Sequence, residues 1–329
     1  MPRVAMVFTG GTISMRPDPL AGGNTPVLDG AGILARAPEA ARLADLEPID
    51  WGLVPASHLR FSQLLEIARL LEAALARPDI VGAVVVQGTD TIEETAFAYD
   101  LLVRSDKPLM VTGAMRDSAA EDYDGPRNLA DAVRCAISPG LSGLGAQVVL
   151  NGLIVSAADV VKTHTSALDT FQPRDGAPTG RVAGEDVVVE NPRRAARKTL
   201  PHIPERAVED VFLVSAVTGM DGALVRALAP LEPSGLVVAA TGSGNTHADL
   251  LAACVELMAI GTIICLTTRC PRGTVTPVYA FPGGGATWQR EGALLSGLDG
   301  PKTRVALALG LAAGLDGDEL ATLVAWQSV

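Results

Sequence analysis

Short apolar runs rich in β-branched residues alternate with longer amphipathic segments along most of the chain. Residues 3–8, 80–86 and 108–112 are short runs that predict strands, and the second of them is apolar enough to be fully buried. Residues 62–76 instead repeat apolar positions at helical spacing, so we predict a helix there with Ser62 as its cap. This alternation is typical of parallel βαβ units and predicts an α/β fold.

The pattern breaks once and then resumes. Residues 173–206 are irregular and rich in Pro, Arg and Gly, which is typical of a domain edge and a linker. From residue 209 onward strands and helices alternate again, with helices expected over 248–260, 301–314 and 317–326. A chain of 329 residues is also longer than one core usually supports. We therefore predict a larger N-terminal domain with a mostly parallel sheet (1–190), a linker (191–210) and a smaller C-terminal α/β domain (211–329).

Polar loops follow several of the predicted strands. Thr9-Gly10-Gly11-Thr12 follows the first strand, and Gln87-Gly88-Thr89-Asp90 lies between strand 80–86 and a helix start that Thr91 and Glu94 mark as a capping box. Gly113-Ala114-Met115 follows strand 108–112, and a loop carrying Lys162 follows a strand predicted over 147–155. Ligands of open α/β sheets bind at the carboxyl ends of the strands, so these loops predict one common site.

Charge narrows the choice of partners. The formal net charge is −11, whereas nucleic acids and anionic membranes are bound by clustered Lys and Arg. The first apolar stretch has only five residues, and no stretch reaches the roughly 20 that a membrane span needs, so we expect a cytoplasmic protein that binds a small molecule. The four cysteines sit in or beside apolar segments, and Cys265 and Cys270 lack a common zinc spacing, so we expect neither a disulfide nor a metal.

Each polar loop has an ordinary structural interpretation beside a catalytic one. Gly10 and Gly11 allow a sharp turn and a close approach to a ligand, but plain Gly-rich turns are common. A phosphate cradle is disfavoured, because the loop lacks both the GxGxxG spacing and a P-loop lysine. Thr89-Asp90 is also a good helix cap, and Lys162 alone would be read as a solvated charge. Together they suggest chemistry, since a lysine with a lowered pKa can take a proton from a hydroxyl.

These blocks closely resemble the bacterial-type L-asparaginase family in order and spacing along nearly the whole chain. Further blocks carry the same resemblance: Glu94-Thr95, Arg116, Asp124-Gly125, Asn128, and Asp159 to Thr163. The resemblance implies a large and a small α/β domain, no cofactor, and a homodimer or homotetramer with sites at subunit junctions. It also implies that Thr12 attacks a side-chain amide to give an acyl-enzyme and ammonia, with Thr89, Asp90 and Lys162 as the second polar group. The positions implied to bind substrate are Gly11, Ser57, His58, Gly88, Ala114 and Asn245, the last from the neighbouring subunit.

The chain departs from the family pattern at three places. The loop after the first motif normally carries a tyrosine that bonds the nucleophile, but residues 22–26 contain none. His58 and Leu59 replace the residues that usually follow the carboxylate-binding serine, and residues 276–280 lack the acidic residue that binds the substrate amine. Asp90 would then be the only carboxylate for that amine.

Several functions therefore stay open at this point. The first is hydrolysis of L-asparagine to L-aspartate, and the second is a same-fold amidase for a small amide or cyclic imide without a free α-amine. A binding protein that has lost turnover is a third, although the nucleophile and its partners are present. Transfer of ammonia to a tRNA is disfavoured, because it needs a basic surface and a further N-terminal domain that we do not expect here.

Overall fold

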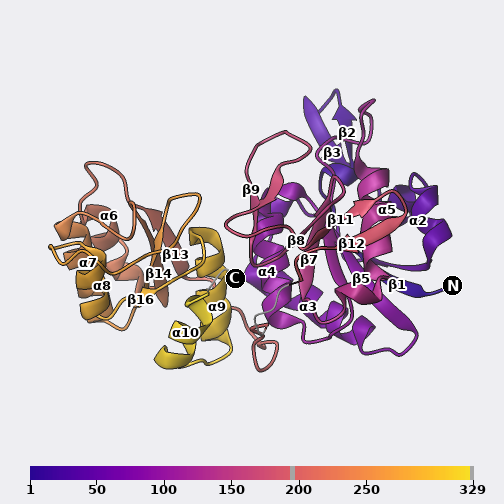
Figure 1. Ribbon diagram of the computed structural model, residues 1–329. Helices are drawn as coiled ribbons and strands as arrows, with labels where there is room; N and C mark the ends of the chain where they lie inside the picture. Colours follow the sequence, from indigo (N-terminus) through magenta and orange to yellow (C-terminus); the bar gives the residue numbers. More distant parts are fainter. Residues whose placement is uncertain (193–196, 327–329) are drawn as a thin grey trace. The chain divides into compact units, whose positions relative to one another are not determined.

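The computed structural model describes residues 1–192 and 197–326. The chain divides into two compact units, residues 1–199 and 200–328, each with its own sheet (Figure 1). Residues 193–196 of the expected linker lie outside the described residues. The mixed α/β architecture, with the larger sheet in the N-terminal unit, confirms the predicted fold class.

The first unit is built on one eight-stranded sheet in the order β12-β11-β8-β7-β6-β5-β1-β4. The five strands from β4 to β7 are parallel, whereas β8, β11 and β12 pair antiparallel at the other edge. The strands are β1 (Arg3–Phe8), β4 (Asp45–Asp50), β5 (Ile80–Val86), β6 (Leu109–Thr112), β7 (Ala146–Leu150), β8 (Leu153–Ser156), β11 (Gly180–Ala183) and β12 (Asp186–Val189). The remaining strands of this unit form two short hairpins, β2 (Met15–Asp18) with β3 (Gly23–Pro26) and β9 (Val160–Lys162) with β10 (Phe171–Pro173).

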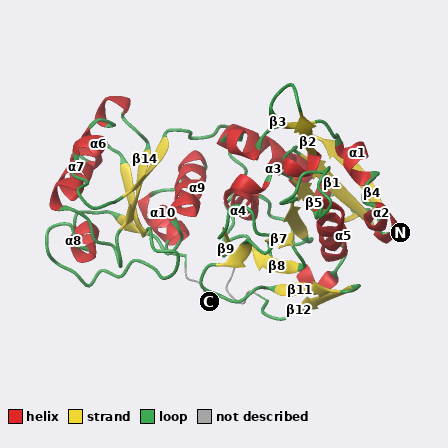
Figure 2. Cartoon of the chain, turned by 90° about the horizontal axis from the view of Figure 1, so that it is seen from above, coloured by secondary structure: helices red, strands yellow, loops and turns green. Residues whose placement is uncertain are grey.

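Helices cover both faces of this sheet, as Figure 2 shows. α2 and α5 pack together on one face, and α3 and α4 pack on the other. The central strands β1, β5 and β6 are therefore apolar along their length and almost wholly buried. The helices of this unit are α1 (Gly30–Leu34), α2 (Pro38–Leu43), α3 (Phe61–Leu75), α4 (Ile92–Leu102) and α5 (Gly125–Ala136), with short 3-10 turns η1 (Thr12–Ser14), η2 (Ala56–His58), η3 (Thr89–Thr91) and η4 (Pro139–Leu141).

Both capping predictions were wrong, although both helices exist. α3 begins at Phe61, so Ser62 lies within its first turn, and the N–H of Arg60 donates to Gln63 Oε1 at 3.0 Å instead. α4 begins directly after Thr91 as predicted, but the Thr91 hydroxyl makes no cap. It donates to the carbonyl of Ala56 at 3.1 Å, because another segment of the chain packs against this turn.

The strand expected over 147–155 is a tight hairpin. The chain reverses between β7 and β8 at Asn151 (φ 50°) and Gly152 (φ 75°), a backbone conformation that these two residue types tolerate well. Lys162, expected in a loop, is the last residue of β9. Its hairpin partner β10 holds it beside α4 and the end of the sheet.

The second unit is a four-stranded parallel sheet in the order β13-β14-β15-β16, with helices on both faces (Figure 2). Its strands are β13 (Val211–Ser215), β14 (Gly235–Ala240), β15 (Ile263–Thr268) and β16 (Leu294–Leu295). Its helices are α6 (Ala223–Arg226), α7 (Ala248–Met258), α8 (Gly285–Arg290), α9 (Gly300–Ala312) and α10 (Gly317–Val324), with the 3-10 turn η5 (Ala229–Leu231). Within the described ranges, no helix has the length and apolarity to span a membrane.

Candidate active site

Two turns meet at the carboxyl ends of neighbouring strands β1 and β5. Gly10 and Gly11 follow β1 with φ of 102° and 96°, a region that L side chains rarely adopt. A Cβ built on Gly11 would lie 2.1 Å from the backbone nitrogen of Gly88 and 2.2 Å from its Cα. The two turns are therefore in direct backbone contact, which puts Thr12, the first residue of η1, beside the loop that carries Thr89.

Thr89, Asp90 and Lys162 form a hydrogen-bonded group. The Lys162 Nζ donates to Thr89 Oγ1 at 3.1 Å and to Asp90 Oδ1 at 3.1 Å. Thr89 is buried, the Lys162 side chain is 15% exposed, and the Asp90 side chain is 70% exposed. The backbone N–H of Lys162 also donates to Glu93 Oε2 at 2.7 Å, which ties β9 to the start of α4. This group therefore places the hydroxyl of Thr89, the amine of Lys162 and the carboxylate of Asp90 within hydrogen-bonding distance, and the carboxylate faces solvent.

The turn after β6 closes the next side of the site. A Cβ on Gly113 would lie 2.5 Å from the carbonyl oxygen of Gln87, so this turn packs against the loop after β5. Asn128 Nδ2 donates to the Gly113 carbonyl at 3.0 Å, and the Asp124 carboxylate accepts the N–H groups of Met115 and Arg116. Ala114, expected to bind substrate, is fully buried in the core, so none of its atoms is exposed to a ligand in this structure.

Ser57 and His58 lie on η2, which packs against the turn that carries Thr89. Both residues are exposed. Besides the hydrogen bond from Thr91 to the Ala56 carbonyl, a Cβ on Gly88 would lie 2.9 Å from the Ala56 Cβ. Ser57 and His58 therefore belong to the same edge as the Thr89 group, as their sequence positions led us to expect.

The turn that carries Thr12 is held by its backbone. The N–H and hydroxyl of Ser14 both donate to the Gly11 carbonyl, at 2.9 and 2.7 Å. The Tyr123 hydroxyl donates to the Ile13 carbonyl at 2.9 Å. Within the described part of the chain, no side chain hydrogen-bonds the Thr12 hydroxyl, so that hydroxyl stands free to meet a substrate.

Sequence reasoning missed the residues that hold the backbone around the site. Glu93 accepts the N–H of Lys162. Tyr123 donates to the carbonyl of Ile13, and Ser118 donates to the carbonyl of Met15. All three bind backbone groups, and no residue pattern marks such contacts. The one available signal was position, because Ser118 and Tyr123 lie in the loop directly after the Gly113 turn.

Asn245 lies in the second unit, in the turn after β14. Its N–H donates to the Thr241 carbonyl and its own carbonyl accepts the Thr241 N–H, which forms an isolated bridge. Its side-chain oxygen is buried and has no hydrogen-bond partner among the described residues. The structure thus gathers the expected residues of the first unit at one edge, while Asn245 is set in a rigid turn of its own unit.

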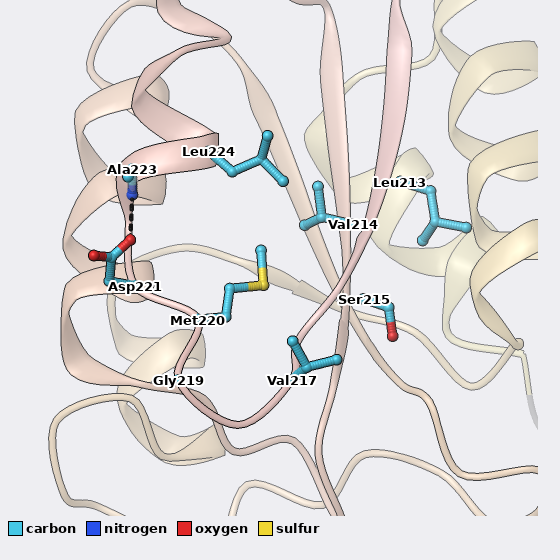
Figure 3. A pocket seen from close by; sticks show the side chains of 9 residues that line it. All are labelled: Leu213, Val214, Ser215, Val217, Gly219, Met220, Asp221, Ala223 and Leu224. Carbon is cyan, nitrogen blue, oxygen red and sulfur yellow. Dashed lines mark hydrogen bonds between the residues drawn. The ribbon is translucent and has the colours of Figure 1, made fainter.

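The second unit also holds a pocket of about 590 Å³ beside β13 and α6, drawn in Figure 3. The side chains of Val214, Met220 and Leu224 point into it. Asp221, one of its few polar residues, already accepts the N–H of Ala223 at 2.9 Å (Figure 3). Its described lining has no nucleophile paired with a base. Likewise, no group of His, Cys, Asp and Glu within the described ranges has the arrangement of a metal site.

Known proteins are similar to this chain along nearly its whole length. Residues 3–195 match the family model described as Asparaginase, N-terminal, and residues 210–324 match that described as Glutaminase/Asparaginase C-terminal domain. A probable L-asparaginase of Deinococcus radiodurans is 35% identical over 336 residues, covering 97% of this chain and 96% of that protein. An L-asparaginase of Bacillus licheniformis is 30% identical over 322 residues, covering 96% and 97%.

A solved structure shares the fold as well. The crystal structure of a probable cytoplasmic L-asparaginase from Campylobacter jejuni superposes with a TM-score of 0.88 at 27% identity. The match covers 98% of this chain and 99% of that one, so both units have counterparts there.

Proposed function

Because this chain belongs to the asparaginase family, we propose that it hydrolyses the side-chain amide of L-asparagine to give L-aspartate and ammonia. The protein is an amidohydrolase of the asparaginase type. The observation that carries the substrate and the mechanism is the group formed by Lys162 with Thr89 and Asp90, set beside the turn of Thr12 by the contact of Gly11 with Gly88.

In the proposed reaction the Thr12 hydroxyl attacks the amide carbon, and the Thr89 and Lys162 pair relays its proton to the amide nitrogen. The tetrahedral intermediate collapses as the C–N bond breaks, and the protonated nitrogen leaves as ammonia. Water then attacks the ester carbon, the bond to the Thr12 oxygen breaks, and Thr12 regains a proton as the acid leaves. Because Lys162 donates to the oxygen of Thr89, the Thr89 hydroxyl is free to direct its own proton toward the substrate.

Substrate recognition follows from the same edge of the sheet. Backbone N–H groups near Thr12 and Thr89 would hold the oxyanion, a contribution of about 2.7–4 kcal/mol per donor in known enzymes. Ser57 would bind the substrate carboxylate, and Asp90, bonded through one oxygen and largely exposed, would bind the amine. His58, Gly11 and Gly88 would line the site.

We further propose that the enzyme works as a homodimer or homotetramer in which Asn245 of a second copy completes each site. The support is the family resemblance together with the rigid turn that presents Asn245. Light scattering of the purified protein gives the oligomeric state, and a monomer at assay concentration with full activity would exclude this arrangement.

The proposed function is tested by ammonia release with L-asparagine, D-asparagine, L-glutamine and the amine-free succinamic acid. Wild-type protein should turn over L-asparagine best, and Thr12→Ala should lose that activity. Thr12→Ser, which keeps a hydroxyl, is the matched control and should retain a measurable part of it. Turnover of succinamic acid without turnover of L-asparagine would replace the proposal by an amidase that needs no α-amine.

A further inference from the structure

The segment that follows β6 reaches over the turn that carries Thr12. The Tyr123 hydroxyl donates to the carbonyl of Ile13, the residue directly after Thr12, at 2.9 Å. Two residues further along, the Met15 carbonyl accepts both the hydroxyl (2.8 Å) and the N–H (3.1 Å) of Ser118. The turn is therefore held by a separate loop as well as by the contact of Gly11 with Gly88.

That loop is itself anchored to the catalytic edge of the sheet. Asp124 accepts the N–H groups of Met115 and Arg116 and the Nδ2 of Asn128, which in turn donates to the Gly113 carbonyl. A Cβ on Gly125 would lie 2.4 Å from the ring of Tyr123, so the ring lies against the first residue of α5. Tyr123 thus links the turn after β6 to the turn after β1.

The Tyr123 hydroxyl is suited to donate a hydrogen bond at all working pH values. Burial and the neighbouring Asp124 carboxylate raise the pKa of the phenol far above its usual value, so it keeps its proton at any working pH. It cannot serve as a base, and its hydrogen bond goes to a backbone carbonyl and not to the Thr12 hydroxyl. Its role is therefore geometric.

We propose that Tyr123 is a positioning residue for the nucleophile, which aims the Thr12 hydroxyl by fixing the carbonyl of Ile13. The inference rests on the proposed function of Thr12. It offers an answer to the missing tyrosine of the loop at residues 22–26, because Tyr123 steadies the nucleophile through the backbone beside it. Small displacements of a reacting group are costly, and a shift of about 1 Å can lower the rate about 100-fold.

The test compares Tyr123→Phe with two matched controls. Tyr123→Phe keeps the ring and removes one neutral hydrogen bond, so kcat for L-asparagine should fall about tenfold with KM within about twofold. The single-turnover rate of ammonia release with enzyme in excess, which reports attack by Thr12, should slow by a similar factor. Tyr99→Phe in the core and Tyr279→Phe on the surface of the second unit make the same chemical change and should leave all three quantities unaltered.

A readout independent of turnover keeps the inference separate from the proposed function. Hydrogen exchange of the backbone amides from Thr12 to Met15 should speed up in Tyr123→Phe, and also in Ser118→Ala, which serves as a second variant should the first fold poorly. If the wild type hydrolyses L-asparagine and Tyr123→Phe changes neither the amide exchange nor kcat, the role of Tyr123 is overturned and the proposed function is not. If the wild type hydrolyses none of the amides and Thr12→Ala behaves in the same way, the proposed function is wrong, and there is no nucleophile for Tyr123 to position.

Discussion

Substitution of Gly11 by alanine gives a sharp test of how the site is held together. The new Cβ would lie 2.1 Å from the Gly88 nitrogen, whereas ordinary contacts begin near 3.4 Å, so the two turns must separate by more than 1 Å. The backbone of Gly11 (φ 96°, ψ −175°) is also open almost only to glycine, which adds about 1–3 kcal/mol of strain for any other residue. The nucleophile turn and the Thr89 turn would move apart.

We therefore expect Gly11→Ala to lower kcat/KM for L-asparagine at least about 100-fold. The free energy of unfolding should fall by about 1–3 kcal/mol from the backbone strain alone. Ammonia release and urea unfolding measure the two quantities. Gly22→Ala is the matched control, because Gly22 also has a positive φ (69°) but has open space around its Cβ position.

The control separates backbone strain from loss of the contact between the turns. Gly22→Ala should lose a little stability and keep its kcat within about threefold, since only the strain term applies to it. If Gly11→Ala kept a kcat/KM near that of the wild type, the argument that the Gly11 and Gly88 backbones must touch for catalysis would be refuted.

Three further predictions follow from single side chains. Because we propose that Lys162 handles the proton, Lys162→Met should lower kcat for L-asparagine about 10²–10⁴-fold, and Lys162→Arg should not restore ammonia release because arginine keeps its proton. Arg77 lowers the pKa of Asp79 from 3.8 to about 2, so Asp79 stabilises the fold fully above about pH 4 and loses this effect as the pH falls through about 2. The free energy of unfolding should therefore differ between wild type and Asp79→Asn at about pH 6, and this difference should disappear near pH 2. A difference that persists near pH 2 would contradict the role of Asp79. Tyr99→Phe removes a fully buried hydroxyl without a hydrogen-bond partner among the described residues, so urea unfolding should show equal or slightly higher stability, and a loss above about 1 kcal/mol would contradict this.

The sequence predicted the larger elements well because their cause is the burial of apolar runs. The strand over residues 80–86 was found to the residue, since a strand in the middle of a parallel sheet is buried on both faces. The prediction of a single strand over 147–155 was wrong. Apolar residues on both sides of the turn made the segment look continuous, although Asn151-Gly152 is a strong hairpin signal.

The candidate site could be predicted only in part, because some of its residues are placed by the order of the strands and others by hydrogen bonds to distant backbone groups. Thr12 and Thr89 follow the parallel strands β1 and β5, whose carboxyl ends the topology of the sheet brings together. Lys162 reaches Thr89 from the β9–β10 hairpin, outside that sheet, so the rule for strand ends does not explain its position. The capping role of Thr91 failed because its hydroxyl bonds a distant carbonyl, a tertiary contact that local sequence does not encode. Tyr123 escaped notice for the same reason, since it acts on the backbone of a segment far away in the chain.

The position of β1 bears on when the enzyme becomes competent during its own synthesis. β1 leaves the ribosome before both strands that flank it, β4 and β5, so it waits for residues 80–86 before both its edges are paired. Lys162 emerges much later still, on β9. At about 5–20 residues per second, the interval between Thr12 and Lys162 is on the order of ten seconds. Under the proposed mechanism, Thr12 is therefore synthesised long before Lys162, and a site that also needs Asn245 of a second copy is complete only after both units are made and two chains have assembled.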